Sequence, residues 1–239
     1  MSVENKPKFA VLRSVESFAN PRPSIKHRMR DGKALRKKVS LKAQGTYTPP
    51  KNRVDPISIL ENQAKSRIKE LIPIRYERMS QSPFAFFRGG AAIMSQDLAV
   101  QPSTEITVQL CGDMHVSNFG LFGTAEHRLV FGINDFDETL PGSWEWDLKR
   151  LVSSAVIACE SIGGDKSLSK KLVYRICSEY QKRMAQYAHM PYLELAQEFI
   201  GEKDIRKHFS KEHQKNVDAF LKDTKGQGNI QVLQKLTTL

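Results

Sequence analysis

Two polar stretches, each placed directly after an apolar strand pattern, decide the fold of this chain. The first is GDMHVSNF at residues 112–119, and the second is INDFDE at residues 133–138. Before the first stretch, residues 106–111 alternate apolar and polar side chains, and residues 128–133 lead into the second with a largely apolar run. Such patterns predict short strands. We therefore expect a small antiparallel hairpin sheet whose strand ends bring acidic side chains together.

Helical patterns flank these strands. Asp55-Pro56 is a good helix start, because aspartate caps a helix and proline suits its first position. Apolar residues follow at helical spacing up to Leu71, and Pro73 is expected to end or kink that helix. Further helical patterns cover Ala91 to Leu98, a stretch that begins near Trp144, and residues 167–225. The sequence thus predicts an α+β fold that is mainly helical.

Charge divides the chain into parts. The 239 residues carry 37 basic and 26 acidic side chains, a net charge of +11, and residues 1–53 alone hold 14 basic and 3 acidic ones. Weak apolar periodicity and several prolines predict that residues 1–53 form a basic, largely extended N-terminal arm. Residues 54–225 are the predicted folded domain. Gly226-Gln227-Gly228 breaks the helical pattern, so residues 226–239 are expected to start a truncated following region.

The composition excludes several classes of protein. Hydrophobic residues make up 40% and charged residues 26%, which is ordinary for a globular protein and excludes a disordered or collagen-like chain. The three cysteines fit no zinc or redox motif and indicate reduced thiols. No run approaches the roughly 18 apolar residues of a membrane span, and the first residues lack a signal-peptide core. We expect a cytoplasmic protein without a membrane partner.

Acidic side chains gather around the two polar stretches. Residues 101–150 hold 8 acidic and 3 basic side chains, which indicates a candidate cation site, although a solvated acidic face explains the charge equally well. Asp113 and Asn118 lie five residues apart across a tight loop, and Asp135 enters from the neighbouring strand. Aspartate and asparagine oxygens together with phosphates suit magnesium. This spacing is typical of phosphoryl transfer, in which the first aspartate orients the acceptor hydroxyl and can accept its proton.

The first stretch, GDMHVSN, resembles the Gly-Asp-x-His-x-x-Asn motif of the aminoglycoside and choline phosphotransferase branch of the kinase-like superfamily. INDF at residues 133–136 resembles the metal-binding strand end of that branch, and WEWDL at residues 144–148 resembles its next helix start. The resemblance implies magnesium and ATP as cofactors. It implies a catalytic role for Asp113, metal ligation by Asn118 and Asp135, and an Asp147 that braces the catalytic loop.

Three longer motifs in order, SPFAFFRG at 82–89, CGDMH at 111–115 and NDFDETLPG at 134–142, resemble a bacterial family, domain-of-unknown-function family 2252. The resemblance runs from about Gly32 to the end of the chain. Members of that family are longer and continue into a region with a glycine-rich turn and a lysine that resembles a nucleotide-binding lobe. No such strand-turn-strand pattern occurs in this sequence. The resemblance implies the front part of a protein-kinase-like catalytic lobe over residues 54–225, with the nucleotide-binding lobe missing.

Three further residues have two interpretations each. His115 lies beside the site, where bracing the loop by hydrogen bonds is favoured over action as a catalytic base. Arg88 precedes two glycines where a helix begins, so it could clamp a phosphate of the cofactor or pair with the acidic block. Asp137 is either a second metal ligand or a solvent-facing carboxylate.

The expected function is magnesium-dependent transfer of the ATP phosphate to a hydroxyl of an unknown small-molecule acceptor, with the missing lobe supplied by a complementing polypeptide. A metal-dependent phosphoesterase is disfavoured because the chain contains no Asn-His pair. The alternative is a non-catalytic fragment, or a module that binds a polyanion or nucleic acid through residues 1–53. Tyr47 is the only tyrosine there that could stack on bases.

Overall fold

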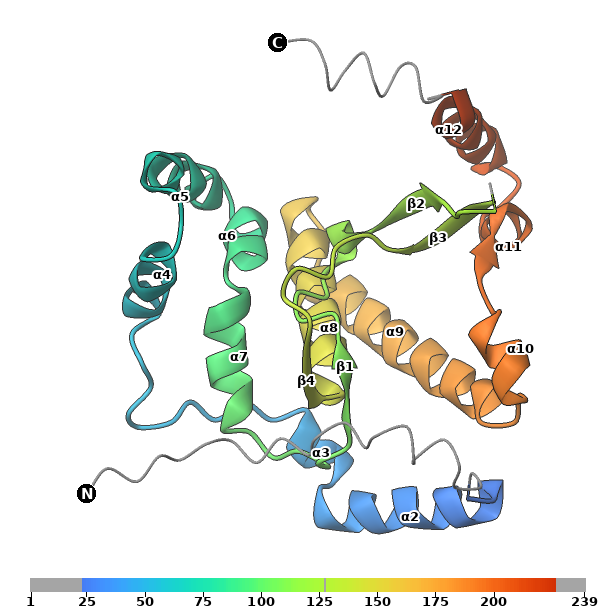
Figure 1. Cartoon of the computed structure of the whole chain (residues 1–239), viewed down its shortest axis with the longest axis horizontal. Helices are drawn as coiled ribbons and strands as arrows, with labels where there is room; N and C mark the ends of the chain where they lie inside the picture. The colour runs from blue at the N-terminus through green and yellow to red at the C-terminus, as the bar shows by residue number, and fades with distance from the viewer. Residues whose placement is uncertain (1–22, 127, 227–239) are drawn as a thin grey trace. The chain divides into compact units, whose positions relative to one another are not determined.

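A computed structural model describes residues 23–126 and 128–226 (Figure 1). It has a mixed α+β architecture in which helices predominate, as the sequence predicts. The chain divides into two compact units: unit 1 comprises Met1–Val116 and Phe136–His189, and unit 2 comprises Ser117–Asp135 and Met190–Leu239. None of the helices in the described ranges has the length and apolar character that crossing a membrane requires.

Unit 1 holds most of the helices and a two-stranded sheet. Its helical elements are α2 (Ile25–Lys38), α3 (Leu41–Gln44), α4 (Pro56–Ala64), η1 (Lys69–Leu71), α5 (Ile72–Ser80), α6 (Pro83–Gly89), α7 (Ala91–Ala99), α8 (Glu145–Ser161) and α9 (Lys166–Tyr187). The strands β1 (Thr107–Leu110) and β4 (Leu140–Ser143) pair antiparallel. Helix α8 packs against α6, α7 and α9 (Figure 1). Leu60, Met79 and Ile93 form a hydrophobic core among α4, α5 and α7.

Unit 2 is built on a three-stranded antiparallel sheet. The short helix η2 (Val116–Asn118) leads into the strands β2 (Phe119–Gly123), β3 (Leu129–Ile133) and β5 (Ile200–Gly201), which stand in that order. The helices of this unit are α10 (Tyr192–Ala196), α11 (Glu202–His208) and α12 (Gln214–Gly226). Helix α11 packs on β3 and β5, and it also contacts α12.

The predicted pairing of the two strands is wrong. Strand β1 pairs with β4, and β3 pairs with β2 and β5, so two sheets replace the single hairpin. The sequence of β2, FGLFG, contains two glycines and therefore has the composition of a loop. Strand β4 contains Pro141, which a two-stranded ladder tolerates because each strand has an edge that forms no ladder bonds.

Several helix boundaries also differ from the prediction. Helix α4 begins as predicted, with the Asp55 side chain accepting a hydrogen bond from the Ser58 N–H, but it ends at Ala64 and not near Leu71. Pro73 lies in the first turn of α5, where a helix needs no N–H donor. In the predicted helical stretch 167–225, α9 ends at Tyr187 and the short strand β5 interrupts the later helices.

The N-terminal segment is largely helical where the structure describes it. Residues 23–53 contain α2 and α3, so the extended conformation predicted for residues 1–53 is wrong for this part, and residues 1–22 lie outside the described ranges. Both helices start at a serine, because the Ser24 and Ser40 side chains accept hydrogen bonds from the N–H groups of His27 and Ala43. Lysine and arginine are good helix formers, and three of them in the last turn of α2 suit its dipole. Basic composition alone therefore did not imply an extended chain.

Candidate active site

The loop that follows β1 is held at its entry by Asp147 of α8. The Asp147 carboxylate accepts hydrogen bonds from the backbone N–H groups of Cys111, at 2.7 Å, and Gly112, at 3.1 Å. Burial raises the pKa of Asp147, and these two N–H groups oppose that rise. Gly112 has a φ of +88°, and a side chain there would collide with the carbonyl of Glu138. The bracing contact is the one that the resemblance implies for Asp147.

Asp113 is an ionised carboxylate held by a buried arginine. Arg150 of α8 places its Nε 2.6 Å and its Nη2 2.5 Å from Asp113 Oδ1, and His115 Nε2 lies 3.5 Å from Oδ2. Burial of Asp113 raises its pKa, but the His115 hydrogen bond and the Arg150 charge outweigh that effect and hold the pKa below its ordinary value. The side chain keeps 19% of its surface exposed, so the carboxylate can still meet a ligand.

His115 packs inside the loop. The residue is 6% exposed, and its ring meets the Phe84 ring edge-on with 6.4 Å between centroids. The Nδ1 atom is buried and has no hydrogen-bond partner within the described ranges. The next residue is anchored as well, because Ser154 Oγ accepts a hydrogen bond from the Val116 N–H at 3.0 Å. These contacts favour a bracing role for His115 over action as a general base.

Sequence reasoning missed Arg150. This residue is 3% exposed, its Nη2 donates to the Phe87 carbonyl at 2.8 Å, and its guanidinium lies 4.3 Å from the centroid of the Phe87 ring. It follows Asp147 by three residues on α8, a spacing that puts both side chains on the same helix face. The three-residue spacing from Asp147 could have identified Arg150, because a residue on the helix face that braces the loop can reach Asp113.

In unit 2, Asn118 and Asp135 lie together although they are 17 residues apart. Asn118 is 5% exposed; its Nδ2 donates to the Asp135 carbonyl at 3.0 Å, and its Oδ1 accepts from the Asp135 N–H at 2.9 Å. The Asn134 N–H donates to the Asn118 carbonyl at 2.9 Å. Asp135 thus follows the β2–β3 pair and has its main chain fixed by Asn118. Metal ligation by these two side chains stays a prediction.

The remaining predicted residues lie as follows. Asp137 and Arg88 are exposed, and Arg88 occupies the last turn of α6. The arginine that pairs with Asp113 is Arg150. Both predicted roles of Arg88, as a phosphate clamp and as a partner of the acidic block, stay predictions. No three His, Cys, Asp or Glu side chains gather to hold a metal ion within residues 23–126 and 128–226, and of the predicted ligands Asn118, Asp135 and Asp137 only the two aspartates belong to those types.

Asp113 belongs to unit 1, whereas Asn118 and Asp135 belong to unit 2. The structure therefore defines two local arrangements: the Asp113–Arg150–His115 cluster on the loop after β1, and the Asn118–Asp135 pair, in which Asn118 directly precedes β2 and Asp135 follows β3. The meeting of all three predicted residues at one magnesium ion remains a prediction.

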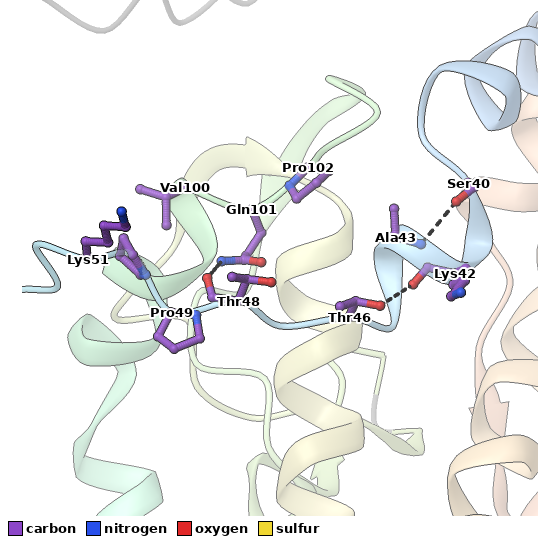
Figure 2. A pocket seen from close by; sticks show the side chains of 11 residues that line it. Ser40, Lys42, Ala43, Thr46, Thr48, Pro49, Lys51, Val100, Gln101 and Pro102 are labelled. Carbon is purple, nitrogen blue, oxygen red and sulfur yellow. Dashed lines mark hydrogen bonds between the residues drawn. The ribbon is translucent and has the colours of Figure 1, made fainter.

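An open pocket of about 710 Å³ lies elsewhere in unit 1, between the segment around α3 and the end of α7 (Figure 2). Gln101 Nε2 donates to the Thr48 carbonyl at 3.2 Å in its wall. Its lining residues are Ser40, Lys42, Ala43, Thr46, Thr48, Pro49, Pro50, Lys51, Val100, Gln101 and Pro102. This lining contains no carboxylate and none of the predicted site residues, so the pocket is separate from the candidate site.

One family of proteins matches the sequence over residues 67–239, which is more than two thirds of the chain. The chain belongs to this family, the "uncharacterized protein conserved in bacteria (DUF2252)" family. The DUF2252 match includes Arg88, the loop after β1, Asp135 and α8, so every residue of the candidate site lies inside it. No curated protein and no solved structure matches the chain.

Proposed function

We propose that this DUF2252 protein supplies the catalytic loop of a kinase-like phosphotransferase, which transfers the γ-phosphate of ATP to a hydroxyl of a small-molecule acceptor with the help of magnesium. Asp113 would orient the acceptor hydroxyl, and Asn118 and Asp135 would bind the metal, with Asp137 as a further candidate ligand. The proposal requires Asp113 to meet the metal-binding residues during the reaction. The proposal is supported by the spacing of the sequence motifs and by the geometry within each of the two units.

The observation that supports the proposal most strongly is the contact of the Asn118 amide with both backbone polar groups of Asp135. It places the two predicted metal ligands next to each other across 17 residues of sequence. An amide oxygen accepts hydrogen bonds with two lone pairs, and the Asp135 N–H uses one of them. An amide oxygen and a carboxylate are oxygen ligands of the kind magnesium prefers.

The chemistry needs little more than positioning and charge. The acceptor oxygen attacks the γ-phosphorus, the bond from that phosphorus to the β-bridging oxygen breaks, and ADP leaves with the electron pair. The acceptor proton passes to the Asp113 carboxylate and then to solvent. Since phosphoryl transfer proceeds through a loose transition state, this proton can leave late, and a carboxylate of low pKa suffices.

The proposal assigns most of ATP binding to groups outside the candidate site. Arg88 is the one predicted site residue assigned to the nucleotide, as a phosphate clamp. We infer that a nucleotide-binding lobe of the kind that the resemblance implies completes the site.

The test measures thermal unfolding of the full chain with ATP and magnesium, with and without EDTA. We expect the melting temperature to rise with Mg²⁺ and ATP together, because a ligand that binds only the folded state stabilises it. Asp135→Asn should abolish the rise. Glu126→Gln, which alters an exposed carboxylate of the same unit, is the matched control and should retain it. A wild-type protein that gives no rise under any of these conditions would contradict the proposal.

A second candidate function, binding of nucleic acid through α2, is favoured by one specific observation. Lys26, Arg30, Lys33 and Lys37 are all exposed and follow one another at spacings of four, three and four residues. They form a stripe about 16 Å long on one side of the helix. The side chains of Ile25, Leu35 and Val39 on the other side are less exposed, so α2 lacks the outward apolar face that membrane binding needs.

This second function is tested with a fluorescent DNA duplex. Substitution of the four stripe residues by glutamine should weaken binding and reduce its dependence on salt, because fewer phosphate counterions are released. The control substitutes four exposed lysines of α9 by glutamine, Lys166, Lys170, Lys171 and Lys182. Equal losses in both variants would mean that only net charge matters and that α2 is not a binding surface.

A further inference from the structure

Arg150 has contacts on several sides of its guanidinium group. The Nε and Nη2 atoms hold Asp113 Oδ1 at 2.6 and 2.5 Å, and Nη2 also donates to the Phe87 carbonyl at 2.8 Å. The flat side of the guanidinium lies 4.3 Å from the centroid of the Phe87 ring, and Nη1 is 3.6 Å from Met94 Sδ. Arg150 thus joins α8, α6 and α7 to the loop that carries Asp113.

A buried arginine is costly unless a negative charge accompanies it. Arg150 is only 3% exposed, and the anion in contact with it is Asp113. The Phe87 carbonyl is neutral and could be satisfied by any donor, so it does not explain why a permanent positive charge is buried here. The buried positive charge of Arg150 is explained by the need to hold the Asp113 carboxylate in place.

We propose that Arg150 is the positioning residue of the candidate active site: it fixes the Asp113 carboxylate by binding Oδ1, turns Oδ2 toward His115 and the acceptor, and links this orientation to α6 through Phe87. This inference rests on the proposed function, because positioning matters only if Asp113 meets an acceptor. Two donors on one carboxylate oxygen restrict rotation of the group, and a misplacement of about 1 Å at a reacting centre costs roughly 100-fold in rate.

A purely structural arginine is the competing explanation, in which Arg150 only ties α6 to α8. The chain provides a matched control for it. Arg75 is half-buried and donates its Nη2 to the Gly89 carbonyl at 2.8 Å, also at the end of α6. Arg75→Met therefore removes an arginine–carbonyl bond of the same kind and leaves the Arg150–Asp113 pair in place.

The first measurement follows the Asp113 side chain directly, by ¹³C NMR titration of the aspartate carboxyl groups in the full chain. The charged and titratable groups that face Asp113 include Arg150 and Asp147 from α8 and His115 from its own loop. We expect Arg150→Met to raise the titration midpoint of Asp113, Arg150→Lys to raise it less, and Arg75→Met to leave it unchanged. An unchanged midpoint in folded Arg150→Met would overturn the inference.

If Arg150→Met does not fold, a double-mutant cycle keeps the inference testable. Asp113→Asn leaves Arg150 buried without its anion, and Arg150→Lys leaves a cation that cannot bind Oδ1 with two donors. Coupled residues lose less in the double variant than the sum of the single losses, as judged from the unfolding midpoint in urea. Additive losses would show that Asp113 and Arg150 act independently and would also overturn the inference.

The third measurement is turnover of ATP by the full chain in the presence of magnesium. Arg150→Lys is expected to lower kcat about 100-fold with little change in the KM for ATP, whereas Arg75→Met should change neither. Absence of turnover and of a magnesium–ATP stabilisation in the wild-type protein would contradict the proposed function. The NMR titration and the cycle do not depend on turnover, so the two failures can be told apart.

Discussion

Glu145 lies buried at the start of α8, and both of its carboxylate oxygens have partners. It is 3% exposed, and its Oε1 accepts from the Thr104 N–H at 2.8 Å, the Thr104 hydroxyl at 2.6 Å and Gln44 Nε2 at 3.0 Å. The Ser143 hydroxyl donates to Oε2. Burial raises the pKa of Glu145, but the hydrogen bonds from Ser143 and Thr104 outweigh burial, so the pKa lies below its ordinary value.

The first prediction concerns Glu145→Gln. The substitution replaces an acceptor oxygen by an NH₂ group among donors, and it should lower the free energy of unfolding at pH 7 by about 1–3 kcal/mol. A carboxylate whose pKa is depressed by folding stabilises the protein above the pKa of the unfolded chain, and the benefit is lost as the pH falls through the folded pKa. The difference between the variant and the wild type should therefore shrink in acid.

Urea denaturation between pH 7 and pH 3 measures this difference. Glu61→Gln, at an exposed position of α4, is the control and should stay within about 0.5 kcal/mol of the wild type at every pH. A constant gap down to pH 3 would mean that Glu145 acts through packing and not through its charge.

At this scale, the sequence predicted the residues of the loop but not their partners. Asp113, Asn118 and Asp135 stand out because their spacing is unusual and their side chains suit one chemistry. Arg150 and Glu145 do not stand out in the sequence. The role of a buried charge depends on the partners that tertiary packing places beside it, and the sequence does not show those partners. The contact of Asp147 with the loop was predicted because the family resemblance implies it.

At the scale of the elements, Gly112 determines how β1 passes into the loop. Its φ of +88° is a conformation that favours glycine, and a Cβ atom would collide with the carbonyl of Glu138, which precedes β4. The chain after β1 and the chain before β4 therefore approach each other closely at this residue. Gly163 has a similar φ of +84°, but a Cβ there would have no neighbour within 4 Å.

The second prediction compares Gly112→Ala with Gly163→Ala. Both variants suffer the strain of a positive φ, about 1 kcal/mol, whereas only Gly112→Ala must also push the Glu138 carbonyl away. We expect Gly163→Ala to lose about 1 kcal/mol of unfolding free energy and Gly112→Ala at least 2 kcal/mol more. Equal losses would show that the loop and the segment before β4 move apart without cost.

The same scale explains which elements the sequence predicted. Strand β1 and helices α7 and α8 follow clear apolar periodicity, β3 is a largely apolar run, and each lies where the pattern placed it. Strands β2 and β4 consist of FGLFG and LPGS, whose glycine and proline content is typical of turns. Only the partner strand makes such segments extended, so pairing could not be deduced from either segment alone.

For the whole molecule, residues 23–53 are attached to the rest of unit 1 by specific contacts. Lys38 Nζ lies 2.8 Å from Glu105, and Gln44 donates to the buried Glu145. The Arg53 guanidinium binds the Asp97 carboxylate with two donors, at 2.6 and 2.7 Å. Charge and proline content predicted an arm here because neither property reports tertiary contacts. Residues 23–53 also lie before the start of the family match at residue 67.

The third prediction separates attachment from charge in this segment. Deletion of residues 1–53 removes the Gln44 bond to Glu145 and the Arg53 pair with Asp97, so a loss of about 2–3 kcal/mol should lower the melting temperature by roughly 5–10 °C. Replacing the exposed stripe Lys26, Arg30, Lys33 and Lys37 by glutamine removes four charges but none of these contacts. That variant should melt within about 2 °C of the wild type, because exposed charges contribute little to stability. Scanning calorimetry at 0.15 M salt compares the two. A deletion variant that melts with the wild type would mean that the contacts of α3 and Arg53 add no stability, and residues 1–53 would then behave as the separate arm that their charge first suggested.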